Sequence, residues 1–230
     1  MEKTLIAVTV IASTIILFIC LSRLYHRFRL PLLMPVLTTM IAIIVILSYF
    51  DISYETYMIG GQWLDKLLGP AIVSLAYPLY KQRNIILKQV VPIVGGIIIG
   101  TTIGIVSGLM LTQIFDFTKE QIVSMVPKSI TTPVAMQITS GLGGVPSLTV
   151  VFVMIAGFTG ILVGPYILKW FYLHSDIGRG VAFGSASHAI GTSKAIEYNE
   201  LTFAISSVAM TLSAILGSMI APFIVYLYFL

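Results

Sequence analysis

The chain of 230 residues is dominated by apolar side chains, with 57% hydrophobic and 10% charged residues and a mean hydropathy of +1.01. Because soluble domains carry about 25% charged residues, this composition excludes an ordinary soluble domain. The net charge of +4 does not indicate nucleic-acid binding, since the basic residues stand between apolar runs, as membrane topology requires. Charges are absent from five runs, at 4–22, 30–50, 89–115, 129–168 and 201–230.

Runs of about 18 or more apolar residues are candidate membrane spans. The N-terminal run follows a single Lys and has no small-residue cleavage site, which favours a retained span over a signal peptide. The apolar pattern predicts an all-α polytopic membrane protein with six transmembrane helices near 4–22, 31–50, 64–80, 89–113, 147–169 and 201–229. The third of these is the least regular, because Gly69, Pro70 and Pro78 interrupt it.

The basic residues set the expected orientation, because Lys and Arg collect on the cytoplasmic side. Nine of the 13 fall in alternate connections: Arg23, Arg27, Arg29, Lys81, Arg83, Lys88, Lys169, Arg179 and Lys194. The other four, Lys3, Lys66, Lys119 and Lys128, fall in the opposite connections. We therefore expect a multi-pass protein with both termini outside.

Two polar, helix-breaking stretches, 127–133 (PKSITTP) and 184–194 (GSASHAIGTSK), interrupt this apolar chain. Each follows a similar apolar segment, TIGIVSG at 102–108 and FTGILVG at 158–164, whose glycine pairs favour close helix packing. Irregular backbone at membrane depth must line water or be buried in protein. Paired interruptions indicate a solute-binding site, so the sequence predicts two re-entrant hairpins in an inverted repeat.

The first stretch offers a cation and several hydroxyls for an anionic substrate. The candidate binding residues are Ser129, Thr131, Thr132 and Pro133, with Lys128 supplying positive charge. Pro133 disfavours helix at Thr132, and a helix that starts there would point its free N–H groups at the break. In the alternative reading, Lys128 reaches the outer surface and the hydroxyls only cap a helix.

The second stretch offers Ser187, His188, Gly191 and Thr192 as substrate-binding residues. A His inside a membrane core is a functional candidate and titrates near neutral pH, so His188 is also the candidate for proton coupling. The alternative is a neutral His188 bonded to a backbone carbonyl. Lys194 and Glu197 are candidates for charge or coupling, or form an ordinary helix-surface pair.

Tyr77, Pro78 and Tyr80 at the end of the irregular third span form a candidate gate, or belong to the aromatic belt at the membrane interface. Catalytic signatures are missing: there is no His-Glu-x-x-His metal pair, no Gly-x-Ser-x-Gly elbow and no Walker loop. We therefore expect no enzyme activity, no catalytic residue, no metal site and no cofactor.

The chain resembles the CidB/LrgB family of membrane proteins over about residues 5–229. The resemblance rests on LGPA at 68–71, YPLYKQ at 77–82, KSITTP at 128–133, GGVPSLT at 143–149, RG at 179–180, SHAIGT at 187–192, Glu197, and Ser206-Ser207 with Met210. Lys194 stands where relatives often carry Arg, which is not an equivalent anion clamp.

The resemblance implies a bacterial cell-membrane protein that works beside a small CidA/LrgA-like (holin-like) membrane protein. Members of the family are linked to holin/antiholin-like control of murein hydrolases and cell lysis, and to transport of pyruvate, glycolate or glycerate. It therefore implies a small carboxylate as substrate.

Together these features predict a proton-linked secondary transporter of small monocarboxylates that works with a small holin-like partner. We expect residues 1–83 to form scaffold helices of a homodimer and residues 84–230 to form the transport unit, embedded in lipid. The alternative is a holin/antiholin-like regulator of murein hydrolase activity and autolysis that transports nothing itself.

Overall fold

The computed structural model describes the chain except residues 1, 29–32, 68–69, 71–72 and 75. The described residues form helices and connecting turns, with no strand among them. They divide into two compact units, Met1–Ser74 and Leu75–Leu230. The scaffold and transport roles expected of residues 1–83 and 84–230 remain predictions.

The N-terminal unit consists of α1 (Glu2–Phe28), α2 (Pro35–Tyr49) and α3 (Tyr54–Asp65). α3 begins at a Ser53 cap, whose hydroxyl accepts a hydrogen bond from the amide of Thr56. Gly60 lets α3 approach α1 closely, since a Cβ there would lie 2.6 Å from Cβ of Val10. These packed helices expose large apolar side chains that suit a lipid environment.

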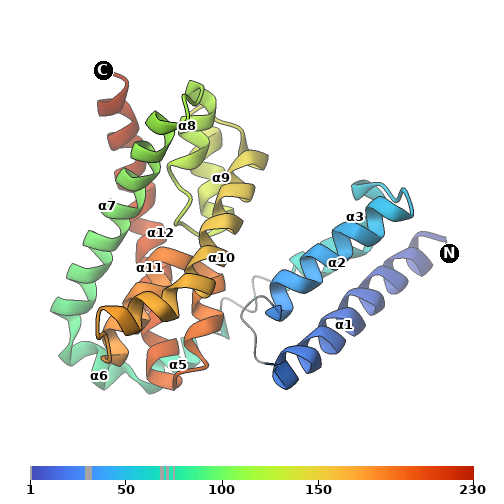
Figure 1. The fold of residues 1–230 in the computed structure, drawn as a ribbon, viewed down its shortest axis with the longest axis horizontal. Coiled ribbons are helices and arrows are strands. Elements are labelled where there is room, and N and C mark those ends of the chain that lie inside the picture. The colour runs from blue at the N-terminus through green and yellow to red at the C-terminus, as the bar shows by residue number, and fades with distance from the viewer. Residues whose placement is uncertain (1, 29–32, 68–69, 71–72, 75) are drawn as a thin grey trace. The chain divides into compact units, whose positions relative to one another are not determined.

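The C-terminal unit begins with two short helices, α5 (Ala76–Lys81) and α6 (Arg83–Lys88), and then α7 (Val90–Ile114). It continues with α8 (Lys119–Met125), α9 (Thr132–Gly141), α10 (Pro146–Trp170), α11 (Asp176–Ala195) and α12 (Glu200–Tyr228). Figure 1 shows α8 and α9 as a short hairpin between α7 and α10, and α11 beside α12.

Within the described residues, four helices are long and apolar enough to cross a membrane: Lys3–Phe28 within α1, then α7, α10 and α12. α2 is apolar but has only 15 residues. The predicted third span, 64–80, does not coincide with one helix in the described part, because α3 ends at Asp65 and α5 begins at Ala76. Residues 68–69, 71–72 and 75 of that span lie outside the described residues.

Both polar stretches are breaks between helices. The first separates α8 from α9, where Pro133 stands in the first turn of α9. The second falls inside α11 at His188, whose backbone (φ 44°, ψ −133°) is not helical and joins two helical halves at a kink. A positive φ is uncommon for a residue with a side chain, so the surrounding packing must hold His188 in this conformation.

Candidate functional site: a cavity between the two breaks

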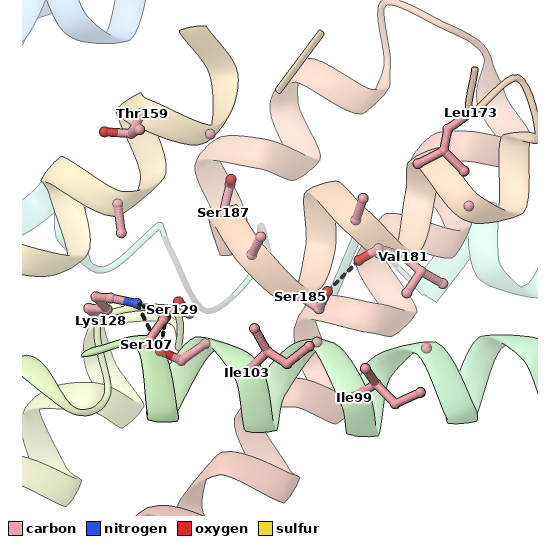
Figure 2. A pocket seen from close by; sticks show the side chains of 18 of the residues that line it. Ile99, Ile103, Ser107, Lys128, Ser129, Thr159, Leu173, Val181, Ser185 and Ser187 are labelled. Atoms are coloured by element: carbon pink, nitrogen blue, oxygen red, sulfur yellow. Dashed lines mark hydrogen bonds between the residues drawn. The ribbon is translucent and has the colours of Figure 1, made fainter. Parts of the chain in front are cut away.

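A cavity of about 1150 Å³ opens in the C-terminal unit between α7, α10 and the first half of α11. Most of its lining is apolar, with side chains such as Ile99, Ile103 and Ile155. Polar side chains gather near the two breaks: Ser107, Lys128, Ser129, Thr159, Ser185 and Ser187. Figure 2 shows Lys128, Ser129 and Ser107 together, with Ser185 and Ser187 on the facing helix. The breaks therefore contribute to one shared site.

Lys128 is the only basic side chain lining this cavity in the described part of the chain, and no acidic side chain lines it. Its ammonium donates hydrogen bonds to the carbonyl oxygen of Gly104 (2.8 Å) and the hydroxyl of Ser107 (3.2 Å). Both acceptors are neutral. Among the described residues, no carboxylate forms an ion pair with Lys128, so its charge remains available to an anion.

Ser129 and Ser187 occupy comparable places against two different helices. A Cβ built on Gly104 of α7 would lie 3.1 Å from the hydroxyl oxygen of Ser129. A Cβ built on Gly160 of α10 would overlap the hydroxyl oxygen of Ser187. Both serines are buried, at 9% and 1% exposure. Since neither hydroxyl has a hydrogen-bond partner among the described residues, both can serve a ligand.

A second pair of glycines repeats this arrangement one turn further along each helix. A Cβ on Gly108 would lie 3.3 Å from the carbonyl oxygen of Met125, and one on Gly164 would lie 3.2 Å from the ring of Phe183. The glycines thus hold α7 and α10 close to the helices that lead into the breaks.

The other candidates of the first break lie beside the cavity and do not line it. Thr131 precedes α9 without a side-chain capping bond, and its carbonyl oxygen accepts a 2.9 Å hydrogen bond from the amide of Ala135. Thr131 and Thr132 are half-buried, and Pro133 is exposed. The first break thus brings Lys128 and Ser129 to the cavity, and its threonines start the next helix.

His188 is buried at 2% exposure and also lies away from the cavity lining. Its Nε2 lies 3.0 Å from the carbonyl oxygen of Val153 in α10. Because a carbonyl only accepts, this nitrogen carries the hydrogen. This geometry matches the alternative of a His bonded to a backbone carbonyl, and the proton-coupling role remains a prediction.

Thr192 and Gly191 pack against the backbone of the second break and do not line the cavity. The hydroxyl of Thr192 donates a 3.0 Å hydrogen bond to the carbonyl oxygen of His188 and lies 3.0 Å from the hydroxyl of Ser206 in α12. A Cβ on Gly191 would collide with the carbonyl oxygen of Phe183. In the structure these two residues hold the kinked backbone in place.

The charged candidates lie outside the cavity lining. Lys194 pairs with Glu197 at 2.5 Å in the i,i+3 arrangement, and the carboxylate side chain is 40% exposed. On α5, the Lys81 ammonium pairs with Glu200 of α12 at 2.9 Å, and this hydrogen bond raises the pKa of Lys81 above its ordinary value. Lys81 thus ties α5 to the start of α12.

The candidate gate lies on α5. Tyr77 and Tyr80 are exposed, and the side chain of Pro78 lies outside the described residues. The guanidinium of Arg83 stacks over the Tyr80 ring at 4.1 Å. Exposed aromatic side chains beside basic residues are typical of a membrane interface, and gating remains a prediction.

Sequence reasoning missed Ser107 and Thr159 as cavity residues, and it placed Ser185 in the second polar stretch without assigning it a role. A signal was present on α7, where Gly96, Gly100, Gly104 and Gly108 recur every fourth residue and mark one face of the helix. Gly100 faces the second break, because a Cβ there would lie 2.7 Å from the hydroxyl oxygen of Ser185. If this glycine face is interpreted as one wall of a cavity, it indicates Ser107 as a lining residue.

The described residues define an all-helical, multi-pass membrane protein with a largely apolar cavity between two helix breaks. Comparison with known proteins gives its family: residues 14–227 match the LrgB-like family, and the chain belongs to it. Uncharacterized protein YxaC of Bacillus subtilis is 55% identical over 228 residues, which are 99% of each chain.

Relatives from staphylococci carry a more informative name. Holin-like protein CidB of Staphylococcus epidermidis is 35% identical over 229 residues, covering 100% of both chains. Holin-like protein CidB of Staphylococcus aureus is 34% identical over 223 residues, covering 97% of both. The expected family is thereby confirmed. No solved structure matches the chain.

Proposed function

We propose that this protein is a secondary transporter of small monocarboxylates, such as pyruvate or glycolate. The observation that carries the proposal is the Lys128 ammonium, held at a cavity between two helix breaks without an acidic partner in the described part. The substrate carboxylate would accept its remaining N–H, and charge-assisted hydrogen bonds of this kind are the stronger ones. The hydroxyls of Ser129 and Ser187 would complete the site.

The side chains that line the cavity favour a substrate with one negative charge and a short apolar body. Among the described residues a single cation lines it, so a dicarboxylate would leave its second charge without a partner, which is costly in a membrane. The whole volume of about 1150 Å³ would hold a drug-sized ligand. A three-carbon acid would therefore use only the end near Lys128.

The paired glycine contacts support an inverted repeat and transport by alternating access. Gly104 and Gly160 meet serines 25 and 27 positions later, and Gly108 and Gly164 meet residues 17 and 19 positions later. Matched contacts at nearly equal spacing are expected of two related helix-plus-hairpin units. Movement of these units around the cavity would open it to each side in turn, without any covalent step.

The test is uptake of radiolabelled pyruvate by proteoliposomes that contain this chain alone, with and without a pH gradient. Saturable uptake that excess lactate or glycolate competes away, and that Lys128→Met removes, is expected. Uptake that needs a co-reconstituted small holin-like protein would make the chain one half of a two-component carrier. The absence of uptake under both conditions, with folded protein, would contradict the proposal.

The names of the staphylococcal relatives favour a second function, because they are called holin-like proteins. In that case the chain would regulate murein hydrolase activity and autolysis together with a small CidA/LrgA-like partner. Lysis assays on cells that carry Lys128→Met distinguish the two functions. A lysis phenotype that persists without uptake favours the regulator, whereas joint loss favours the transporter.

We further propose a homodimer in the bacterial cell membrane, with both termini outside and the N-terminal unit as its scaffold. The chain offers a direct test of the orientation, since Cys20 is its one cysteine. A Cys20→Ser background with single cysteines placed in the α5–α6 and α7–α8 connections can be labelled with an impermeant maleimide. Labelling of α7–α8 but not α5–α6 in intact cells is expected.

A further inference from the structure

The interface between α7 and α12 is built from two matching stripes, each with a residue every fourth position. One buried cluster joins Ile93 and Ile97 with Ile205 and Ala209, and a second joins Ile105 and Leu109 with Ala221 and Val225. Between the clusters, the same spacing places Thr101 on α7 and Ser213 on α12. Two hydroxyls therefore occupy corresponding positions in this interface, near the middle of both helices.

These hydroxyls are buried and have no hydrogen-bond partner in the part of the chain that the structure describes. Thr101 is 3% exposed and Ser213 is 1% exposed, and neither hydroxyl has a bond within the described residues. Ser and Thr hydroxyls inside helices can donate a hydrogen bond to a carbonyl of the preceding turn. Thr112 of α7 and Ser207 of α12 do so, donating to Leu109 and Phe203. A buried hydroxyl without a hydrogen-bond partner destabilises the fold. The hydroxyls of Thr101 and Ser213 are therefore candidates to bind a ligand.

The first break reaches the same place. A Cβ on Gly217, one turn after Ser213, would overlap the side-chain tip of Ile130 and lie 3.7 Å from Cγ2 of Thr101. Among the described residues, the carbonyl oxygens of Lys128, Ser129 and Ile130 accept no hydrogen bond. Free carbonyls of a broken helix and nearby hydroxyls are the oxygen ligands that coupling cations use in transporters.

We propose that Thr101 and Ser213, with carbonyl oxygens of the 128–130 break, bind a small monovalent cation, and Na⁺ fits best. All these ligands are neutral oxygens, and no group of three or more His, Cys, Asp or Glu side chains suited to a metal occurs in the described part. A divalent ion would require carboxylates to offset its dehydration. The nearby Lys128 ammonium also repels a divalent cation more strongly than a monovalent one.

This site lies on a neighbouring face of α7 from the one that lines the carboxylate cavity. Gly100, adjacent to Thr101 in the chain, faces Ser185 in the cavity, and Gly104 faces Ser129. A cation and a carboxylate would therefore bind against the same turn of α7 and attract each other. Coupling of their movement rests on the proposed function, whereas binding of the cation does not.

The experiment measures thermal unfolding of the purified full chain in NaCl, KCl and choline chloride at equal ionic strength. At Na⁺ about tenfold above its Kd, we expect the Tm to rise by roughly 3–5 °C over choline. Thr101→Val and Ser213→Ala should abolish this rise. Thr112→Val and Ser207→Ala, matched buried positions with satisfied hydroxyls, should retain it.

The variants also control for folding. Removal of an unpartnered hydroxyl should leave Thr101→Val and Ser213→Ala at least as stable as wild type in choline, so a lost response is not a folding defect. Equal Tm values in the three salts, or a Na⁺ response that survives both substitutions, would overturn the site. Carboxylate uptake that continues without Na⁺ would then leave the proposed function intact.

Discussion

The ammonium of Lys128 donates a 2.8 Å hydrogen bond to the carbonyl oxygen of Gly104, which lies 24 positions earlier in the chain. This bond holds the charge of the first break against α7, the helix that also contacts the second break through Gly100 and Ser185. One helix thus brings a cation and the hydroxyls of both breaks to one cavity.

Lys128→Met should lower pyruvate binding and uptake by about tenfold to a hundredfold, because a hydrogen bond to a charged group contributes about 1.5–3 kcal/mol. Saturation kinetics in proteoliposomes measure this loss. Lys88→Met, which removes an exposed lysine at the end of α6, is the matched control and should transport normally. Lys128→Arg should not restore transport, since a planar guanidinium cannot occupy the ammonium position.

Ser107→Ala should weaken substrate binding less than loss of the charge does. The Lys128 ammonium would keep its bond to Gly104 but lose the 3.2 Å bond to Ser107, so its position becomes less fixed. We expect KM to rise about three- to tenfold with an unchanged maximal rate, consistent with a net hydrogen bond of about 1 kcal/mol. Ser218→Ala, at an exposed serine of α12, should change neither value. An unchanged KM in Ser107→Ala would remove Ser107 from the site.

The glycines at the cavity should not tolerate a methyl group. Gly160→Ala places a Cβ on the Ser187 hydroxyl, and Gly104→Ala places one 3.1 Å from the Ser129 hydroxyl. We expect Gly160→Ala to destabilise the protein by about 1–3 kcal/mol and to abolish uptake, with a milder effect of Gly104→Ala. Thermal unfolding and uptake assays report both effects.

Gly95→Ala on α7 is the control for these substitutions, because no atom lies within 4 Å of the added Cβ. It should be neutral or stabilising, since alanine favours helix over glycine by about 1 kcal/mol. If Gly95→Ala were as harmful as Gly160→Ala, helix flexibility rather than contact with Ser187 would explain the loss.

The breaks were predictable from the sequence, whereas the faces of the helices were not. Pro133 and the polar run around His188 contradict a continuous apolar helix, so composition alone locates both interruptions. Which residues of a break enter the cavity depends on how α7 packs against it. The sequence therefore indicates Lys128 and Ser129 together with Thr131 and Thr132, and only the structure separates the first pair from the second.

Other features were hidden for physical reasons. A threonine such as Thr159 within an apolar helix has the same sequence signature whether it packs, caps or binds. The positive φ of His188 depends on its bond to Val153 and on support from Thr192, contacts between residues far apart in the chain or across a kink. Local sequence preferences do not encode such tertiary contacts.

His188→Ala should abolish uptake, because it removes the bond to Val153 and leaves a strained backbone without its support. The informative variant is His188→Asn, since Asn tolerates positive φ, can donate to a carbonyl and does not titrate. If His188 couples proton movement, His188→Asn should bind pyruvate yet lose the dependence of uptake on pH between about 5 and 8. An unchanged pH profile in this variant would assign His188 a structural role only.

Thr192→Val should destabilise the C-terminal unit by about 1–3 kcal/mol, because the carbonyl of His188 and the hydroxyl of Ser206 would lose a buried partner. The measurement is thermal unfolding of the purified protein. Thr211→Val is the control, as Thr211 is exposed on α12 and bonds only within its own helix. Because Thr192 does not line the cavity, the fraction of Thr192→Val that remains folded should bind pyruvate with an unchanged affinity. A weakened affinity in folded protein would instead show that the kink at His188 positions Ser187 for the substrate.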